Sequence, residues 1–405
     1  MKRTAIIGGG AAGFFLAINL KEMCPEMEVT ILERAQKVLR KVEISGGGRC
    51  NLTNSFEEVK DLQSVYPRGH RLLKRLFKRF DHHDTWRWFE DRGVRLVAQA
   101  DHCVFPLSQD SHTIINLFLS EVHRLGVIVK TGCQVKNLDE MGDFDFVCVT
   151  TGGQPRADGL LWLGQEVVEP VPSLFTLSID DISLKALMGT VVPNTSVMIP
   201  ATKMRASGPL LITHWGVSGP AILRLSSYAA RQLYEVEYRS SLLVNWTSCT
   251  EAEATETLTT LMHTCSQKQI PSVAPLGLPQ RLWAYLAEKS LGQRAHAPWG
   301  SLNQKELRRL INVLAADGYT TSGRAPHHDE FVTCGGIALS AVDPNTLESR
   351  TRPGLYFAGE VLDIDGVTGG FNFQTAWTTA FTVAHSIARR GLETLECSCC
   401  EKEMG

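Results

Sequence analysis

RTAIIGGGAAG, residues 3–13, joins a short apolar run rich in β-branched side chains directly to a glycine-rich turn. Residues 14–23 continue with the periodicity of a helix, and residues 28–32 form a second β-branched run that ends at Glu33. This order predicts a βαβ unit with Gly-x-Gly-x-x-Gly at its first turn and an acid at the end of its second strand. We therefore expect a Rossmann-type dinucleotide site at the start of the chain.

The glycines and the acid have different roles in such a unit. Gly8 makes the tight turn, Gly10 lets the backbone approach a pyrophosphate, and Gly13 lets the helix pack closely on the strand. The helix N-terminus directs its free N–H groups at the phosphates. Glu33 is expected to accept hydrogen bonds from the adenosine ribose. Because an acid at this position favours a free 2′-hydroxyl, the pattern indicates FAD or NAD rather than NADP.

A second feature near the C-terminus favours FAD. Residues 354–360, GLYFAGE, form an apolar strand that ends in a Gly-Glu pair, and a glycine-rich loop then leads into a helical pattern over residues 371–389. A carboxylate here can hold a ribityl chain, and the N-terminus of the last helix can face the isoalloxazine edge that becomes negative on reduction. A simple NAD dehydrogenase does not need this element, so the C-terminus is expected to return and complete an FAD site.

Two further segments fit the same site. Residues 45–51, SGGGRCN, form a glycine loop with backbone donors and one cation, which suits a pyrophosphate or a flavin edge. Residues 146–149 predict a buried strand, and Thr151-Gly152-Gly153 follow it at the edge of the sheet where α/β folds bind ligands.

These motifs, together with THWGVSGP at residues 213–220 and CGG at residues 334–336, resemble those of the YhiN/BaiN-type flavoproteins. That family is a branch of the FAD-dependent oxidoreductases with the glutathione-reductase-like FAD fold. The chain departs from the family pattern at residues 154–168, which are short and different. The motifs and the resemblance together give these expected cofactor-binding residues: Gly8, Gly10, Ala11, Ala12, Gly13, Glu33, Arg34, Lys41, Gly47, Gly48, Arg49, Asn51, Thr151, Gly152, Gly359, Glu360, Asp363, Gly370, Phe371, Asn372 and Phe373.

The resemblance also implies a reaction. It implies that a conjugated C=C bond is reduced by hydride from flavin N5, with NADH or NADPH as the expected electron donor. The expected substrate is a small molecule such as a 3-dehydro bile acid-like enone. Uridine in ribosomal RNA is the alternative, and a non-catalytic flavin-binding electron-transfer protein is a further one.

Three residues are candidates for the chemistry. His214 follows an apolar strand in a glycine-rich loop, and imidazole is suited to acid–base work near neutral pH. Cys50 and Arg49 are rivals from the flavin side, since a thiol can donate a proton and a guanidinium can polarise a carbonyl. A histidine beside Trp215 can equally be a hydrogen-bonded structural residue.

The predicted organisation is α/β, with an inserted strand-plus-helix domain between two parts of the FAD-binding domain. The first part covers residues 1–171, the insert 172–330, the second part 331–396 and a frayed tail 397–405. In the insert, short strands are expected at residues 173–179, 210–213 and 235–246. Helices are expected at residues 251–265, 279–288 and 304–316. In the first part, helices are expected at residues 68–80 and 81–92, with another that Ser111 caps and that runs to Leu125.

Charge and composition narrow the function further. The 405 residues carry 41 basic and 43 acidic side chains, a net charge of −2 that gives no overall attraction to nucleic acid or anionic membranes. No apolar run of about 18 residues occurs, and no secretory leader is recognised, so we expect a cytoplasmic protein that does not bind membranes. Eight of the 11 cysteines are scattered without metal-ligand spacing and are expected to be reduced thiols. Cys397, Cys399 and Cys400 lie together in the tail and could bind a soft metal, but no fourth ligand is obvious, so no metal site is expected. The predicted helix at residues 68–80 has a basic face that is either solvated or meets RNA, formed by Arg68, Arg71, Lys74, Arg75, Lys78 and Arg79.

Overall fold

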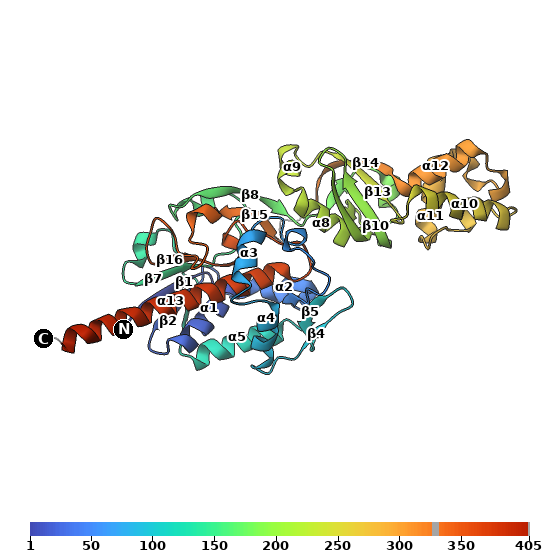
Figure 1. Ribbon diagram of the computed structural model, residues 1–405. Coiled ribbons are helices and arrows are strands. Elements are labelled where there is room, and N and C mark those ends of the chain that lie inside the picture. Colours follow the sequence, from blue (N-terminus) through green and yellow to red (C-terminus); the bar gives the residue numbers. More distant parts are fainter. Residues whose placement is uncertain (326–331, 404–405) are drawn as a thin grey trace. The chain divides into compact units, whose positions relative to one another are not determined.

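The computed structural model describes residues 1–325 and 332–403, with side chains as far as residue 391. The chain forms two compact units (Figure 1). The first comprises Met1–Val171 and Val332–Gly405, and the second comprises Pro172–Phe331. The first unit is thus assembled from both ends of the chain.

A parallel five-stranded sheet forms the centre of the first unit. Its strand order is β16-β7-β1-β2-β6. The apolar runs that predicted strands are nearly continuous because both faces of a parallel sheet are covered, and three of those predictions, for β1, β2 and β7, are confirmed to the residue. The strands are β1 (Arg3–Ile7), β2 (Glu28–Leu32), β6 (Ile128–Lys130), β7 (Phe146–Val149) and β16 (Leu355–Phe357). The predicted apolar strand at residues 354–360 is present as β16, and its pairing with β7 brings the C-terminal segment into the sheet.

Helix α1 (Ala11–Met23) is buried along most of its length because other helices cover it. It packs against α13 (Phe371–Glu403) and α5 (His112–Arg124), and Figure 1 shows α13 running beside α1. Phe15 of α1 meets Trp88 and Trp377 at ring-centroid distances of 4.5 and 5.1 Å. The frayed tail predicted from residue 397 is wrong as far as Glu403, because α13 continues to that residue.

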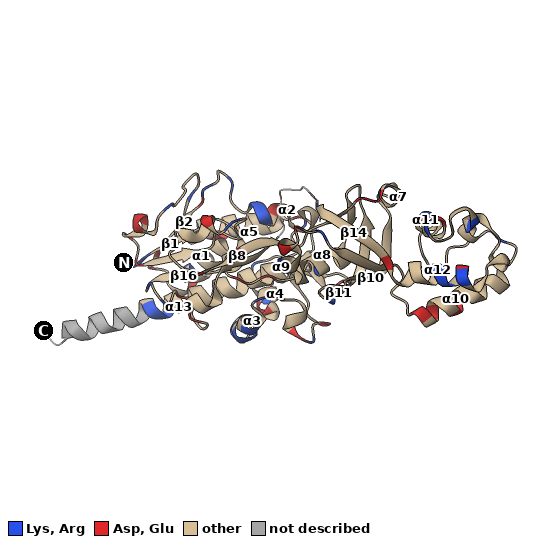
Figure 2. Cartoon of the chain, turned by 90° about the horizontal axis from the view of Figure 1, so that it is seen from above, with Lys and Arg blue, Asp and Glu red and all other residues tan. Residues whose placement is uncertain are grey.

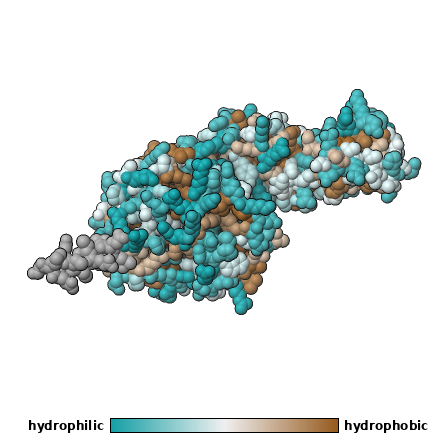
Figure 3. Space-filling view, viewed as in Figure 1, coloured by the Kyte–Doolittle hydropathy of each residue, from teal (hydrophilic) through white to brown (hydrophobic). Residues whose placement is uncertain are grey.

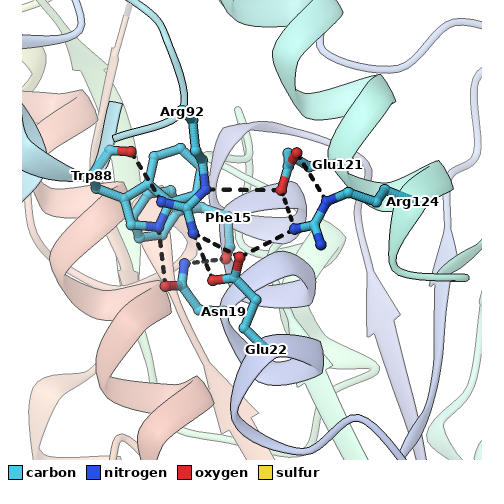
Figure 4. A network of polar contacts seen from close by, with 7 residues as sticks. All are labelled: Phe15, Asn19, Glu22, Trp88, Arg92, Glu121 and Arg124. Atoms are coloured by element: carbon cyan, nitrogen blue, oxygen red, sulfur yellow. Dashed lines mark hydrogen bonds and ion pairs between the residues drawn. The ribbon is translucent and has the colours of Figure 1, made fainter. Parts of the chain in front are cut away.

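Arg92 ties three helices of this unit together (Figure 4). Its guanidinium donates to Glu22 of α1 at 2.6 and 2.8 Å, lies 3.9 Å from Glu121 of α5, and covers the ring of Trp88 in α4 (His82–Glu90) at 3.9 Å. The indole of Trp88 donates in turn to Asn19 of α1. The helix predicted at residues 81–92 is therefore present, and Trp88 belongs to the core rather than to a cleft.

Two predictions in the first unit are wrong in detail. The helix predicted at residues 68–80 is shorter, α3 (His70–Leu76), since Gly69 has a left-handed conformation and Arg68 turns inward to pair with buried Asp365. The remaining basic residues of this segment are exposed, and the ribbon of α3 is largely blue in Figure 2. Ser111 precedes α5 but its hydroxyl donates to the carbonyl of Glu43, and Asp110 accepts from the first turn instead.

Smaller elements complete the first unit. An antiparallel sheet has the order β3-β5-β4, and β8 pairs with β15. The strand predicted at residues 173–179 is interrupted at residues 174–176, so that Ser173 ends β8 and only Leu177–Ile179 form the next strand, β9. The remaining elements are β3 (Thr53–Asn54), β4 (Leu96–Ala98), β5 (Cys103–Pro106), β8 (Val167–Ser173), β15 (Val332–Ile337), α2 (Arg40–Gly48) and α6 (Asp158–Leu161).

The second unit contains a closed barrel of six strands with the order β10-β11-β12-β9-β14-β13. The barrel encloses an apolar core that continues into a helical section. The predicted helices of that section are confirmed with small shifts. The strand predicted at residues 235–246 is shorter, because Glu235 ends helix α9 (Ala230–Glu235) and residues 236–238 form a turn before β13 begins at Ser241. The strands are β9 (Leu177–Ile179), β10 (Val191–Ile199), β11 (Met204–Ile212), β12 (Gly216–Ser218), β13 (Ser241–Asn245) and β14 (Asp317–Arg324). The other helices are α7 (Ile182–Lys185), α8 (Pro220–Tyr228), α10 (Glu251–Thr264), α11 (Gln280–Leu291) and α12 (Gln304–Ala315).

Hydrophilic residues cover much of the face shown in Figure 3, with apolar residues scattered among them. Over the described part of the chain, no helix is both long enough and apolar enough to cross a membrane.

Candidate cofactor site at the edge of the sheet

The β1–α1 turn places its glycines as the sequence pattern requires. A Cβ atom added to Gly13 would lie 2.1 Å from the carbonyl oxygen of Gly8, so only glycine allows the helix to approach the strand this closely. At Gly10, by contrast, an added Cβ would meet no protein atom within 4 Å, and the backbone there is extended. The fold therefore does not need glycine at position 10, whereas a ligand lying against the turn does.

Glu33 reaches back to this turn from the end of β2. One carboxylate oxygen accepts a hydrogen bond from Gly9 N–H at 2.8 Å, and the other accepts from Ala35 N–H at 2.8 Å. These bonds fix the carboxylate beside the turn and leave lone pairs on both oxygens. Arg34 follows Glu33 and is exposed.

The end of β7 lies beside the same turn. The hydroxyl of Thr150 donates to the carbonyl of Gly8 at 2.9 Å. The next residue, Thr151, has a buried hydroxyl with no hydrogen-bond partner among the described residues. Because buried polar atoms are nearly always bonded, a ligand polar group at this edge is the natural partner. Gly152 follows with a left-handed conformation.

Glu360 connects this edge to two distant segments. One of its carboxylate oxygens accepts from Thr333 N–H at 3.0 Å, and the other binds the ammonium group of Lys41 at 2.6 Å. A Cβ on Gly153 would lie 2.6 Å from Glu360 Oε1, so the chain after β7 passes close to this carboxylate. Gly359, directly before Glu360, is buried and donates its N–H to Thr379 of α13.

The glycine loop at residues 45–51 meets the N-terminus of α13. The side-chain amide of Asn51 donates to Thr53 O at 3.0 Å and accepts from Gly370 N–H at 3.2 Å. Gly370 approaches the backbone so closely that an added Cβ would lie 2.1 Å from Thr53 O. In the loop itself, Cβ atoms at Gly47 and Gly48 would meet nothing within 4 Å, which is the same open space found at Gly10.

The first residues of α13 make contacts that fix the start of this helix. Phe371 is buried, and its carbonyl accepts from the Tyr66 hydroxyl at 2.9 Å. The amide of Asn372 exchanges two hydrogen bonds with Gly366, and the Phe373 ring stacks on Trp377. These contacts therefore hold the loop and the helix start in place, which leaves the N–H groups of the first turn as the groups that can face a ligand.

Asp363 and Asp365 lie in the loop before α13. Asp363 is partly buried, and its N–H donates to Ile337 O at 2.9 Å. Asp365 is fully buried and forms a bidentate ion pair with Arg68. The sequence did not reveal this pair, because nothing in it connects a basic residue expected on a solvated helix with an acid almost 300 positions away.

The three catalytic candidates differ in accessibility. Arg49 is partly buried: its guanidinium lies 4.2 Å from the Phe105 ring centroid and donates to Gly46 O at 3.0 Å. Cys50 is fully buried, and this burial raises the pKa of its thiol to about 12. A buried thiol that holds its proton so firmly is poorly suited to donate it, so the structure argues against Cys50 as the proton donor.

His214 belongs to the second unit. It lies in the turn between β11 and β12, where Thr213 N–H donates to Gly216 O at 2.8 Å. The imidazole is exposed, with its ring 4.7 Å from that of Trp215. The structure therefore leaves His214 accessible to a substrate.

Most of the predicted cofactor residues thus converge on one edge of the sheet. The open space at Gly10, Gly47 and Gly48 and the unpartnered hydroxyl of Thr151 fit a bound dinucleotide. No group of three or more metal-ligating side chains occurs among the described residues.

The Rossmann-type fold and this edge define the class: the protein is a flavin-dependent oxidoreductase. Residues 2–386 match the family model described as the HI0933-like protein Rossmann domain, and the chain belongs to that family. The predicted fold class, the resemblance and the class of enzyme are confirmed.

The chain is similar to two enzymes of known activity and to one solved enzyme structure. The chain is 25% identical to the 3-dehydro-bile acid delta(4,6)-reductase of Clostridium scindens, over 96% of this chain and 100% of that protein. It is 27% identical to the ribosomal RNA dihydrouridine synthase of Haemophilus influenzae, over 95% of this chain and 98% of that protein. Among solved structures, 3-ketosteroid delta1-dehydrogenase from Sterolibacterium denitrificans has a TM-score of 0.47 and 11% identity, covering 96% of this chain and 100% of that one.

Proposed function

We propose that this enzyme holds FAD along the C-terminal edge of the five-stranded sheet and reduces a conjugated C=C bond in a small enone. NADH or NADPH is the proposed electron donor. The cofactor part of the proposal rests on the open space beside Gly10 together with the unpartnered buried hydroxyl of Thr151. Neither feature serves the protein's own packing.

Different residues of this edge are proposed to bind different parts of FAD. The N-terminus of α1, with Ala11 and Ala12, is proposed to receive the pyrophosphate, and Glu33 the ribose hydroxyls. Glu360, fixed by Lys41 and Thr333, is proposed to hold the ribityl chain. The N-terminus of α13 provides a positive dipole end at the edge where a reduced isoalloxazine gains negative charge.

Bound FAD would supply hydride transfer from its N5 atom. The chain's own residues must orient the enone and protonate the carbon next to the one that receives hydride. We propose His214 for this proton transfer, supported by its exposure in a tight turn and by an imidazole's suitability near neutral pH. Arg49 is proposed as the cation at the flavin side.

We propose an enone as substrate because one relative of this chain is a bile-acid reductase. RNA is the second candidate because the surface at α3 is basic. Lys74, Arg75 and Lys78 are exposed on and directly after α3 and form a basic face. The ribbon of α3 is largely blue in Figure 2. Such a face can meet RNA phosphates. It is also of the kind that commonly faces solvent.

Anaerobic stopped-flow measurements test the proposal. The flavin is first reduced with NADH or NADPH, and its reoxidation is then followed after mixing with a steroid enone or with a ribosomal RNA fragment. We expect rapid reoxidation by the enone, equally fast in the Lys74→Glu/Lys78→Glu variant. Reoxidation by RNA that is lost in this variant would instead support the second candidate. Arg75 is left unchanged because its guanidinium donates to Asn345 at 3.1 Å. A purified protein that binds no FAD would refute the proposal.

A further inference from the structure

The guanidinium group of Arg49 is held in one orientation by three neutral groups. Its Nε–H donates to the carbonyl of Gly46 at 3.0 Å, and Nη1 donates to Oε1 of Gln109 at 3.3 Å. Its central carbon lies 4.2 Å from the centroid of the Phe105 ring, which covers one face of the group. Nη2 has no partner among the described residues, so its N–H groups are the ones that can bind a ligand.

The surroundings that support Arg49 are themselves fixed. Gly46 has a left-handed backbone conformation with φ 56°, and a Cβ atom there would lie 2.9 Å from Phe105. Phe105 is only 3% exposed, so the ring beneath the guanidinium belongs to the core of the first unit. The absence of a side chain at Gly46 therefore lets the glycine loop approach this ring and brings its carbonyl within reach of Arg49.

Gln109 is fixed at both ends of its side-chain amide. Oε1 accepts from Gln99 Nε2 at 3.2 Å as well as from Arg49, and Nε2 donates to Pro106 O at 3.1 Å. The Pro106 carbonyl can only accept, so this bond turns the oxygen of the amide toward Arg49. The backbone of Gln109 has φ 55°, in the region that glycine occupies more easily. The side chain of Gln109 therefore explains a glutamine at this position better than its backbone does.

The loop that contains Arg49 also contacts the N-terminus of α13. Asn51, two residues after Arg49, accepts from Gly370 N–H at 3.2 Å. The isoalloxazine edge is proposed to lie at this end of α13. Cβ atoms added to Gly47 and Gly48 would meet no protein atom within 4 Å, so the loop is open on this stretch. The unpartnered donors of Arg49 thus belong to a segment with space for a ligand close to the proposed flavin.

We propose that Gln109 is a positioning residue, which directs Arg49 at the carbonyl oxygen of the enone. The inference rests on the function proposed above. When hydride from the reduced flavin forms a C–H bond at one carbon, the electron pair of the C=C bond moves toward the carbonyl oxygen. A proton added to the neighbouring carbon then restores the carbonyl group. Donors that are already oriented stabilise the negative charge that develops on the oxygen, and a guanidinium group offers planar donors with a permanent charge.

A double-mutant cycle on the FAD-loaded protein tests this role, with Gln109→Met, Arg49→Met and the double variant. Single-turnover reoxidation of the reduced flavin by a 3-oxo steroid enone is followed at increasing enone concentration. In Gln109→Met the limiting rate should fall roughly tenfold to hundredfold, as expected for a misplaced catalytic group, while the enone concentration that gives half of that rate changes little. Arg49→Met should lose roughly 10²–10³-fold. The double variant should be no slower than Arg49→Met, because Gln109 acts only through Arg49.

Ligand binding provides a second measurement that does not depend on turnover. Estradiol has a phenol oxygen where a 3-oxo steroid has its carbonyl oxygen, and its binding is followed through the absorbance of the oxidised flavin. A phenol bound as its anion resembles the charge distribution after hydride addition. Gln109→Met should therefore bind estradiol roughly tenfold more weakly, as expected for a weakened hydrogen bond between charged groups.

Gln63→Met is the matched control, since Gln63 is an exposed glutamine of the same unit. This control should keep the native rate and estradiol affinity, and FAD content should be unchanged in Gln109→Met. A native limiting rate in Gln109→Met, a further loss in the double variant, or loss of FAD from Gln109→Met would overturn the inference and leave the proposed function intact. A native protein that binds FAD but neither reduces the enone nor binds estradiol would overturn both.

Discussion

The ammonium group of Lys41 and the carboxylate of Glu360 lie 2.6 Å apart although 319 positions separate them in the sequence. Lys41 belongs to α2, directly before the glycine loop, and Glu360 follows the strand that returns the C-terminus to the sheet. The two side chains differ in exposure, since that of Lys41 is 55% exposed and that of Glu360 only 18%. A shielded carboxylate with an exposed partner is better placed to act on a ligand than to stabilise the fold.

Glu360→Gln should weaken FAD binding more than Lys41→Met does. The substitution removes the charge that accepts from Thr333 N–H and from Lys41, and a hydrogen bond to a charged group contributes about 1.5–3 kcal/mol. We expect roughly tenfold to hundredfold weaker FAD binding in fluorescence titrations. Lys41→Met should weaken FAD binding less, because an exposed ion pair contributes less than about 1 kcal/mol. Equal FAD affinity in Glu360→Gln and the native protein would contradict the role proposed for this carboxylate.

Gly10→Val should empty the cofactor site without harming the fold. The backbone at Gly10 is extended and an added Cβ would meet no protein atom within 4 Å, so the melting temperature of the flavin-free protein should be nearly unchanged. FAD occupancy, measured as flavin absorbance per chain, should fall at least tenfold because the side chain occupies the space proposed for the pyrophosphate.

Gly13→Ala is the contrasting variant. Its Cβ would overlap the Gly8 carbonyl, so this change should lower the melting temperature itself. If Gly10→Val kept full FAD occupancy, the cofactor would have to bind elsewhere.

The local parts of the fold were predictable because short-range rules specify them. The glycine spacing at residues 8–13 encodes a strand, a tight turn and a helix within one segment, and the structure has β1, α1 and β2 where the pattern places them. Because both faces of the sheet are buried, its strands also appear in the sequence as apolar runs. The same reasoning predicted an apolar strand at residues 354–360, but not that it joins the sheet beside β7.

Long-range partners were not predictable. Arg68 reads as one more cation of a basic helix, yet it is drawn inward because Asp365 lies buried and needs a partner. In the second unit, β10 and β14 were missed, since barrel closure depends on pairing between strands that are distant in the sequence. Cys50 was considered as a proton donor from its neighbours alone, and only the structure shows its complete burial.

Arg92→Met should destabilise the first unit by about 2 kcal/mol, as expected for the loss of hydrogen bonds to charged groups. The Arg92 side chain is only 17% exposed, and its removal leaves Glu22 without the guanidinium that holds α1 to α4. Arg124→Met is the matched control, because Arg124 binds the same two glutamates but is 56% exposed. Its cost should stay below about 1 kcal/mol. Urea unfolding curves measure both, and equal losses would contradict the structural role of Arg92.

The Cys50 thiol should resist alkylation in the native protein. Burial raises its pKa from 9.0 to about 12, so at pH 8 almost no thiolate is present and the reagent cannot reach it. Iodoacetamide labelling followed by peptide mass spectrometry should modify partly exposed Cys133 but modify Cys50 only after unfolding in urea.

The same shift predicts a loss of stability at high pH. Between pH 9 and about 12 the folded state keeps the Cys50 proton while the unfolded state loses it, so the free energy of unfolding falls as the pH rises. The contribution of this thiol is at most about 1.4 kcal/mol per pH unit. Cys50→Ala should flatten the pH dependence, and an unaltered slope would show that Cys50 does not cause it.

His214→Ala should slow substrate reduction while leaving the flavin intact. The imidazole is exposed in the second unit, whereas every proposed FAD-binding residue lies in the first, so flavin content and the rate of NADH or NADPH oxidation should not change. If His214 protonates the substrate carbon, the substrate half-reaction should slow by roughly 10²–10⁴-fold, the range of general acid catalysis. Single-turnover reoxidation of the reduced flavin measures this step. Cys50→Ala serves as the comparison and should retain the native rate, because its buried thiol keeps its proton. A His214→Ala variant with an unchanged half-reaction would exclude the imidazole, and Arg49 would then be the next residue to test.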